Sequence, residues 1–242
     1  MQNNLTKKDI EKLNKWAKKY DIKKLQTKYK NKLLDIKELM LGELSRAEKN
    51  FSYIPNEIFK LVNLKELYIK SINLKALPKD IGNLINLEEL TIGSNCKLKK
   101  LPKEIGKLTN LKKLEIRCEK LNELPKELFN LTNLKEFEIR SENLVKLPKE
   151  ICNFSKLENI EIACENLKEL PHEIGNLKKL KYFTLWESNL KKFPKEFGNL
   201  INLEYFKIYS SYSLKEFPKE IANFTKLIHL SIECYKMKEL PR

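Results

Sequence analysis

Residues 101–116 read LPKEIGKLTNLKKLEI, and this stretch decides the fold because close variants of it recur along the chain. The prolines mark the recurrence, since all nine are separated by 23 or 24 residues. They are Pro55, Pro78, Pro102, Pro125, Pro148, Pro171, Pro194, Pro218 and Pro241. Spacing this regular predicts an architecture of stacked structural repeats.

Each repeat combines a strand signal with a short helical signal. Leu114 and Ile116 alternate with polar residues, which is typical of a strand that buries one face. Ile105 and Leu108 lie three residues apart after Pro102, which suits one turn of 3₁₀ or α-helix with proline at its start. Successive strands should therefore run parallel, side by side, and bury a continuous core that no single repeat could form.

With these residues the sequence resembles the leucine-rich repeat family, whose pattern is L-x-x-L-x-L-x-x-N-x-L-x-x-L-P. The resemblance covers about residues 36–242 and is to the 23-residue subclass of bacterial and intracellular proteins. It implies an α/β fold, a right-handed horseshoe-shaped solenoid with a concave parallel sheet and short 3₁₀ or α turns on the convex side. We expect a helical cap over residues 1–34 and a solenoid over 35–242, with one degenerate and eight regular repeats.

The family's asparagine position departs from the pattern. It holds Ile72, Asn95, Glu119, Glu142, Glu165, Ser188, Ser211 and Tyr235, so only Asn95 matches. A turn rebuilt with inward-facing small side chains is one interpretation that the sequence leaves open. The candidates for that role are Ser71, Ser94, Cys118, Ser141, Cys164, Ser210 and Cys234.

The two ends differ from the repeats. Thr6 and Asp9 form a capping-box pattern before a helix expected over about residues 7–20, and Asp21 is expected to start a second helix carrying Ile22, Leu25 and Tyr29. Ile36, Leu39 and Leu41 predict a degenerate first strand. At the other end, Leu240, Pro241 and Arg242 follow the eighth repeat without a cap. Either that edge meets a partner, such as a second copy end to end, or the last repeat is partly ordered.

Composition and cysteine content suggest a compartment. The 242 residues are 41% hydrophobic and 33% charged with a formal charge of +15, which is typical of a globular protein. The first ten residues are polar, and no apolar run reaches the ~20 residues of a membrane span, so we expect neither a signal peptide nor a transmembrane helix. Five cysteines without a C-x-x-C pair indicate neither a disulfide framework nor a zinc site. We therefore expect a cytoplasmic protein, or alternatively one exported without an ordinary signal peptide.

The sequence offers little for catalysis. The two histidines, His172 and His229, have no evident nucleophile, and no phosphate-binding glycine motif occurs. Cys118 and Cys164 share a repeat column two strands apart, roughly 10 Å, which is too far to bridge, so buried packing is their expected role. We expect a noncatalytic protein without cofactor or metal.

The outward strand positions of the middle repeats carry charge. Glu115, Glu138 and Glu161 should stack about 5 Å apart, which is repulsive unless cations such as Lys113, Arg117 or Arg140 lie alongside. One interpretation is a neutralised ladder on a solvated face. The other is a mixed-charge surface that recognises basic or polar groups of a partner.

Aromatic residues gather on the outward phase of the later repeats, at Tyr182, Trp186, Tyr205 and Tyr209, with His229 on the next strand. Exposed Trp and Tyr on a rigid sheet are typical of a binding hot spot. The plain alternative is a repeat with a generally larger aromatic content.

The sequence therefore predicts a protein–protein interaction module that binds a protein or peptide on its concave face. One alternative is a polyanion, either nucleic acid or an anionic membrane, bound by the basic N-terminal helices, since residues 1–50 hold 14 Lys and Arg against 7 Asp and Glu. Nucleic acid is the weaker of these partners because no nucleic-acid module is recognisable. An exported effector or adhesin is a further alternative.

Overall fold

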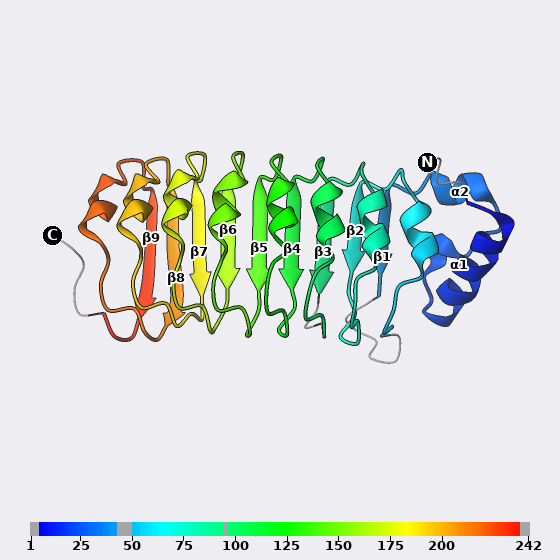
Figure 1. The fold of residues 1–242 in the computed structure, drawn as a ribbon, viewed down its shortest axis with the longest axis horizontal. Helices are drawn as coiled ribbons and strands as arrows, with labels where there is room; N and C mark the ends of the chain where they lie inside the picture. Colours follow the sequence, from blue (N-terminus) through cyan, green and yellow to red (C-terminus); the bar gives the residue numbers. More distant parts are fainter. Residues whose placement is uncertain (1–4, 43–49, 94–95, 238–242) are drawn as a thin grey trace.

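The computed structural model describes residues 5–42, 50–93 and 96–237, and it forms one sheet of nine parallel strands in chain order (Figure 1). The strands are β1 Glu38–Leu41, β2 Glu66–Ile69, β3 Glu89–Gly93, β4 Lys113–Arg117, β5 Glu136–Arg140, β6 Asn159–Ala163, β7 Tyr182–Trp186, β8 Tyr205–Ser211 and β9 His229–Cys234. Each strand from β2 to β9 follows a 3₁₀ turn. These turns are η3 Asn56–Lys60, η4 Lys79–Asn83, η5 Lys103–Lys107, η6 Lys126–Asn130, η7 Lys149–Asn153, η8 His172–Asn176, η9 Lys195–Asn199 and η10 Lys219–Asn223.

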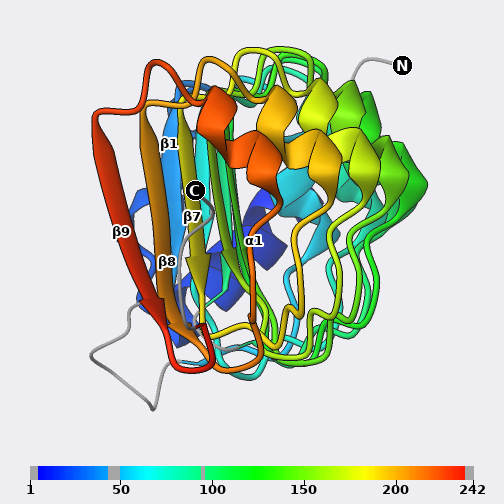
Figure 2. The same cartoon turned by 90° about the vertical axis from the view of Figure 1, so that its left-hand side faces the viewer.

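Strands and 3₁₀ turns form two layers with the core between them. Figure 2 shows the sheet on one side and the column of turns on the other. The inward residues of every strand from β1 to β8 are buried, as are the leucines and phenylalanines that flank the turns. The predicted solenoid of alternating strands and helical turns is confirmed.

Proline starts each 3₁₀ turn, as the sequence predicts. At η5 the Pro102 carbonyl accepts the N–H of Ile105 at 3.1 Å, and the Ile105 carbonyl accepts that of Leu108 at 3.1 Å. Pro102 has φ −68°, the angle that its ring imposes, so the residue enters the turn without loss of a needed donor. The apolar pair thus points into the core once per repeat.

One glycine column lets neighbouring turns approach closely. A Cβ atom on Gly175 in η8 would collide with the backbone carbonyl of Glu196 in the next repeat. Glycine at this place therefore sets how tightly consecutive repeats stack.

A ladder of asparagines that the sequence analysis missed joins the repeats. Each of these asparagines precedes the conserved leucine, and its Nδ2 donates to a backbone carbonyl one repeat earlier at 2.8–3.0 Å. They are Asn63, Asn86, Asn110, Asn133 and Asn202. Where Lys156 replaces asparagine, its Nζ donates instead to the side chain of Asn133 at 2.6 Å. This ladder lies before the strands, whereas after the strands Asn166 donates to the Glu142 carbonyl at 2.8 Å and Asn143 to the Asn122 side chain at 3.3 Å.

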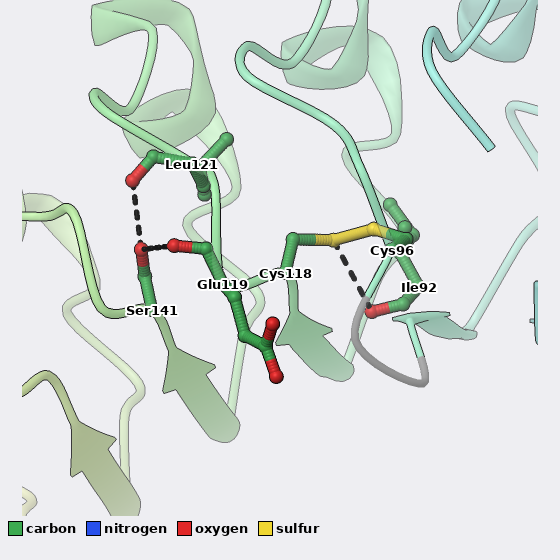
Figure 3. The surroundings of a disulfide bond; sticks show 6 residues. All are labelled: Ile92, Cys96, Cys118, Glu119, Leu121 and Ser141. Atoms are coloured by element: carbon green, nitrogen blue, oxygen red, sulfur yellow. Dashed lines mark hydrogen bonds between the residues drawn. A yellow bond between two sulfur atoms is a disulfide. The ribbon is translucent and has the colours of Figure 1, made fainter. Parts of the chain in front are cut away.

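Small inward side chains rebuild the turn after the strand, as one interpretation of the sequence proposed. The Ser141 hydroxyl donates to the carbonyl oxygens of Leu121 at 2.7 Å and of Glu119 at 3.2 Å (Figure 3). Ser71 donates to the Phe51 carbonyl at 2.6 Å. The Cys164 thiol, 3.9 Å from a backbone carbonyl, is buried, which raises its pKa to about 12. Ser94 and Asn95 lie outside the described residues, as does the side chain of Ser210.

The expectation that no cysteines pair was wrong, because Cys96 and Cys118 form a disulfide with their Cα atoms 4.8 Å apart (Figure 3). Their separation of 22 residues is almost one repeat, which brings them side by side on adjacent coils. Cys96 belongs to a different repeat column from Cys118, so a comparison within the column of Cys118 does not reveal the pair. The Cys118 Sγ also contacts the Ile92 carbonyl oxygen at 4.0 Å. Cys152, Cys164 and Cys234 are free thiols.

The N-terminal segment begins with helix α1, Lys7–Lys19. The capping box is confirmed, since Thr6 and Asp9 exchange side-chain and backbone hydrogen bonds. The expected second helix from Asp21 was wrong. Asp21 has φ +57°, and the Ile22 N–H donates to the Ala17 carbonyl at 2.8 Å, so the chain forms a Schellman stop at the end of α1. A short 3₁₀ turn η1 (Lys23–Leu25) and helix α2 (Lys30–Leu34) follow.

Two ion pairs and an aromatic contact hold α1 against the first repeat. Lys12 pairs with Glu57 at 2.7 Å, and Lys60 pairs with Asp9 at 2.9 Å. Burial acts to raise the pKa of Asp9, but hydrogen bonds from Lys60 and Thr6 outweigh it and lower the value to about 2. Trp16 lies edge-on to Phe51 in the core beneath the helix. The helical segment is therefore docked on the first coil by both charge and packing.

At the far end, β9 is the edge of the described sheet, and its flanking side chains Ile228 and Leu230 are exposed. The expectation about an uncapped end concerns Leu240, Pro241 and Arg242, which lie outside the described residues. Within the described ranges, no helix is both long and apolar enough to span a membrane.

Candidate binding face

The parallel register brings the outward residues of neighbouring strands side by side on the face of the sheet opposite the 3₁₀ turns, here called the open face. In the strand register Glu115 lies opposite Glu138, Glu138 lies opposite Glu161, and Tyr182 lies opposite Tyr205. The columns that the sequence predicts are thus confirmed from β2 to β8. Strand alternation alone therefore positions every candidate binding residue of this face.

Four aromatic side chains form two stacked pairs on β7 and β8, here called the aromatic stacks. The ring centroids of Tyr182 and Tyr205 lie 4.8 Å apart at an interplanar angle of 14°. Those of Trp186 and Tyr209 lie 4.2 Å apart at 22°. The plain alternative of core filling does not hold for these residues, since they are partly exposed while Phe183 lies buried beneath them. The stacks present preordered aromatic edges to solvent.

His229 extends the first stack onto β9. Its ring lies 6.1 Å from that of Tyr205 at an angle of 27°. The second stack is not extended in the same way, because the β8–β9 register shifts between Ile208 and Ser211. The aromatic surface is therefore three strands wide on one row and two on the other.

The middle of the open face holds a charged ladder that its own cations largely neutralise. Arg117 donates to both carboxylate oxygens of Glu138, from Nε at 2.6 Å and from Nη2 at 2.9 Å. Its Nη2 also lies 3.5 Å from Glu115, which pairs with Lys113 at 3.0 Å. Arg140 forms no ion pair among the described residues. The predicted neutralisation is thus real for Glu115 and Glu138.

Glu161 is the exception in this ladder, since it forms no ion pair among the described residues, although a hydrogen bond with the Trp186 side chain acts to lower its pKa. Burial, and after it the neighbouring charge of Glu138, raises the pKa of Glu161. Arg117, Arg140 and the indole of Trp186 act in the opposite direction but do not cancel the shift. A carboxylate without an ion pair among the described residues therefore lies next to the aromatic stacks.

A small hollow of about 160 Å³ lies at the carboxyl ends of β5 and β6, and its lining includes Ala163, two residues after Glu161. It is lined by Glu119, Arg140, Ser141, Glu142, Ala163, Glu165 and Glu187. Four carboxylates thus surround one guanidinium. Sequence reasoning missed this hollow, although the signal was present in the glutamates that replace the family's asparagine.

The two histidines lie in different elements, His172 in turn η8 and His229 in strand β9. His172 is exposed and lies 3.3 Å from Glu173, its neighbour in the chain, while His229 belongs to the aromatic row. Among the described residues, no group of three or more His, Cys, Asp or Glu side chains could hold a metal ion.

Comparisons with known proteins agree with this architecture. A family model described as "Leucine-rich repeat region" matches residues 14–144 and 126–241. A leucine-rich repeat protein of Leptospira interrogans is 30% identical, with a TM-score of 0.69 over 86% of this chain and 57% of that one. The chain therefore spans little more than half the length of that relative. A comparison with curated protein sequences finds no match.

Two other solved structures are similar. The leucine-rich repeat domain of the type III effector XopL has a TM-score of 0.68 over 98% of each chain at 20% identity, which shows the shared fold alone. The plant peptide hormone receptor RGFR1, solved in complex with RGF2, is 27% identical with a TM-score of 0.52 over 74% of this chain and 34% of that one. Leucine-rich repeats are commonly noncatalytic scaffolds for protein–protein interaction. From its repeat pattern, its sheet and the family match over most of its length, the chain belongs to the leucine-rich repeat family.

Proposed function

We propose that this protein is a noncatalytic interaction module that binds a protein or peptide on its open face, with Tyr182, Trp186, Tyr205 and Tyr209 as anchors. The observation that carries the proposal is the pair of aromatic stacks, with ring centroids 4.8 and 4.2 Å apart on adjacent strands. Rings that are already held by each other lose little entropy on binding, so more of their buried area counts toward affinity.

The surrounding face supports the same role. The strands under the stacks belong to a continuous hydrogen-bonded sheet, so the anchors are presented by a rigid support. We further propose the division into a cap over residues 1–34 and a solenoid over 35–242, in which the cap closes the first coil and the later coils carry the binding surface.

The test is affinity capture from native cell extract with the wild type and a Trp186→Ala, Tyr209→Ala double variant. A control variant with Tyr29→Ala and Tyr53→Ala removes two other exposed tyrosines, which are 55% and 56% exposed and lie off the open face. We expect a partner captured by the wild type and the control but not by the stack variant. Equal capture by all three proteins would refute this site.

A direct assay uses tryptophan fluorescence. The chain holds two tryptophans, Trp16 on helix α1 of the cap and Trp186 on the open face. In a Trp16→Phe variant, Trp186 is the single source of tryptophan fluorescence, so binding of a captured partner to the open face should change that fluorescence. A partner that binds without changing it would contact another surface.

A second candidate is an anion-binding function of the N-terminal segment. A hollow of about 750 Å³ beside α1 is lined by Leu5, Lys7, Ile10, Glu11, Asn14, Lys15, Lys18, Lys28 and Lys30. Five ammonium groups around partly apolar walls suit a polyanion or an anionic surface. Salt distinguishes the two functions, because polyanion binding weakens steeply as salt rises, whereas contact through aromatic rings changes little.

A further inference from the structure

The open face has the opposite charge to the protein as a whole. The chain carries a formal charge of +15, yet the nine strands contain eight glutamates and four cations, a net charge of −4. The glutamates are Glu38, Glu66, Glu89, Glu115, Glu136, Glu138, Glu161 and Glu233, and the cations are Lys113, Arg117, Arg140 and Lys207. The excess positive charge therefore lies off the sheet, and the open face attracts cations.

Most of this negative charge is already engaged. Glu66 and Glu89 both accept from the Tyr68 hydroxyl, at 2.9 and 3.3 Å. Lys113 lies 3.8 Å from Glu136 and closer to Glu115. At the two edges, Glu38 pairs with Lys24 at 3.4 Å and Glu233 accepts from Tyr235 at 3.1 Å. Seven of the eight carboxylates thus have an ion pair or accept a hydrogen bond from a tyrosine or arginine in the described structure, whereas Glu161 forms no ion pair there and has only the Trp186 indole as a side-chain partner.

The position of Glu161 joins two features that suit one kind of side chain. Glu161 is diagonal to Trp186 across the β6–β7 register, so the stack of Trp186 and Tyr209 lies beside it. The acidic hollow that contains Ala163 lies toward the same carboxyl end of the strands, since Ala163 is opposite Trp186 in that register. A planar guanidinium or an ammonium group could pair with a carboxylate while its stem lies along aromatic rings.

We propose that Glu161 and the Trp186–Tyr209 stack bind an arginine or lysine side chain of the partner, so that the open face recognises a basic, extended segment of a protein. This inference rests on the proposed function and adds the chemistry of the partner. In the free protein Arg117 and Arg140 act on this half-buried carboxylate without forming an ion pair with it, and the partner's cation would supply that direct pair.

The probe is a random 12-residue peptide library displayed on phage and selected on the wild-type protein. We expect selected peptides to be enriched in arginine or lysine beside an apolar residue, and to lose binding to the Trp186→Leu, Tyr209→Leu variant. Selection on Glu161→Gln should remove the basic preference. Selection on Glu233→Gln, a matched carboxylate of the same face on β9, should retain it.

One selected peptide is then measured with its arginine and with neutral citrulline in the same place. Replacement of arginine by citrulline should weaken binding to the wild type about tenfold or more, because it removes the charge-assisted pair with Glu161. The same replacement should weaken binding to Glu161→Gln by less than threefold, because that variant cannot form the charge-assisted pair with either peptide. Equal losses on both proteins, or selection of peptides without basic residues, would overturn the inference while leaving the proposed function intact. Peptides that bind regardless of the aromatic stacks, or no selected peptides at all, would overturn both.

Discussion

Removal of the Cys96–Cys118 bridge should destabilise the solenoid by a calculable amount. The bridge closes a loop of 22 residues, and both cysteines are buried, at 1% and 0% exposure. In the chain-entropy account a loop of this length is worth about 3 kcal/mol at 25 °C. For a chain of this size that loss corresponds to a decrease in melting temperature of about 6–12 °C.

The assay is urea unfolding followed by circular dichroism, for the wild type and Cys96→Ala, each with and without reductant. Cys164→Ala is the matched control, since Cys164 occupies the same repeat position as Cys118 but is a free buried thiol. Truncation of that thiol should cost about 1 kcal/mol through lost packing and should not depend on reductant. Reductant should lower the stability of the wild type and leave Cys96→Ala unchanged.

Alkylation with iodoacetamide under denaturing conditions provides an independent count of thiols. With three free cysteines and one bridge, the chain should take up three alkyl groups without reductant and five with it. Five groups without reductant, together with unfolding that does not respond to reductant, would refute the bridge and the stability reasoning built on it.

Three further predictions concern packing, pH and the open face. Gly175→Ala should lower the free energy of unfolding by about 1–3 kcal/mol, measured by urea unfolding, because its Cβ would push against the Glu196 carbonyl of the next repeat. Because hydrogen bonds lower the folded-state pKa of Asp9 to about 2, docking of α1 should weaken as pH falls from about 4 to about 2; in Asp9→Asn, Trp16 fluorescence should show no such transition. Burial raises the folded-state pKa of Glu161, so its ionised form opposes folding at pH 7. Glu161→Gln should therefore stabilise the free protein by about 0.5 kcal/mol, measured by thermal unfolding. A loss of stability in this variant would mean that a cation of the protein already pairs with Glu161.

Much of the fold followed from the proline spacing and from alternation within the strands. A period of 23 residues sets which residues lie side by side, and period 2 sets which face they take, so the Tyr182–Tyr205 row could be predicted before any coordinates. The stacking angles could not, because ring orientation depends on the local packing of both neighbours. Sequence reasoning also could not tell that Arg117 would take both oxygens of Glu138 and leave Glu161 unpaired, since rotamers decide that choice.

Two of the features that the sequence did not predict share a physical cause. The Cys96–Cys118 bridge and the hydrogen bond from Asn63 each join one coil to the next, and each links two residues that occupy different positions of the repeat. Alignment of the repeats shows only which residues share a position, so it does not reveal such contacts.

The stop after α1 has a different cause. An aspartate before an apolar residue is typical of a helix start, but Asp21 adopts the left-handed conformation that ends a helix. The bridge also removes the cysteine argument for a reducing compartment, since disulfides persist mainly in oxidising ones.

The strands from β1 to β9 lie in the sheet in the same order as in the chain, so each coil contacts its immediate neighbours. Excision of one whole period between the cap and the charged ladder, such as residues 64–86, would leave two coils with matching surfaces. They could close on each other and bring α1 about 4.8 Å nearer to the aromatic rings. The distance between α1 and the aromatic rings can thus change in steps of one coil, while the contacts within α1 and within the aromatic stacks stay the same.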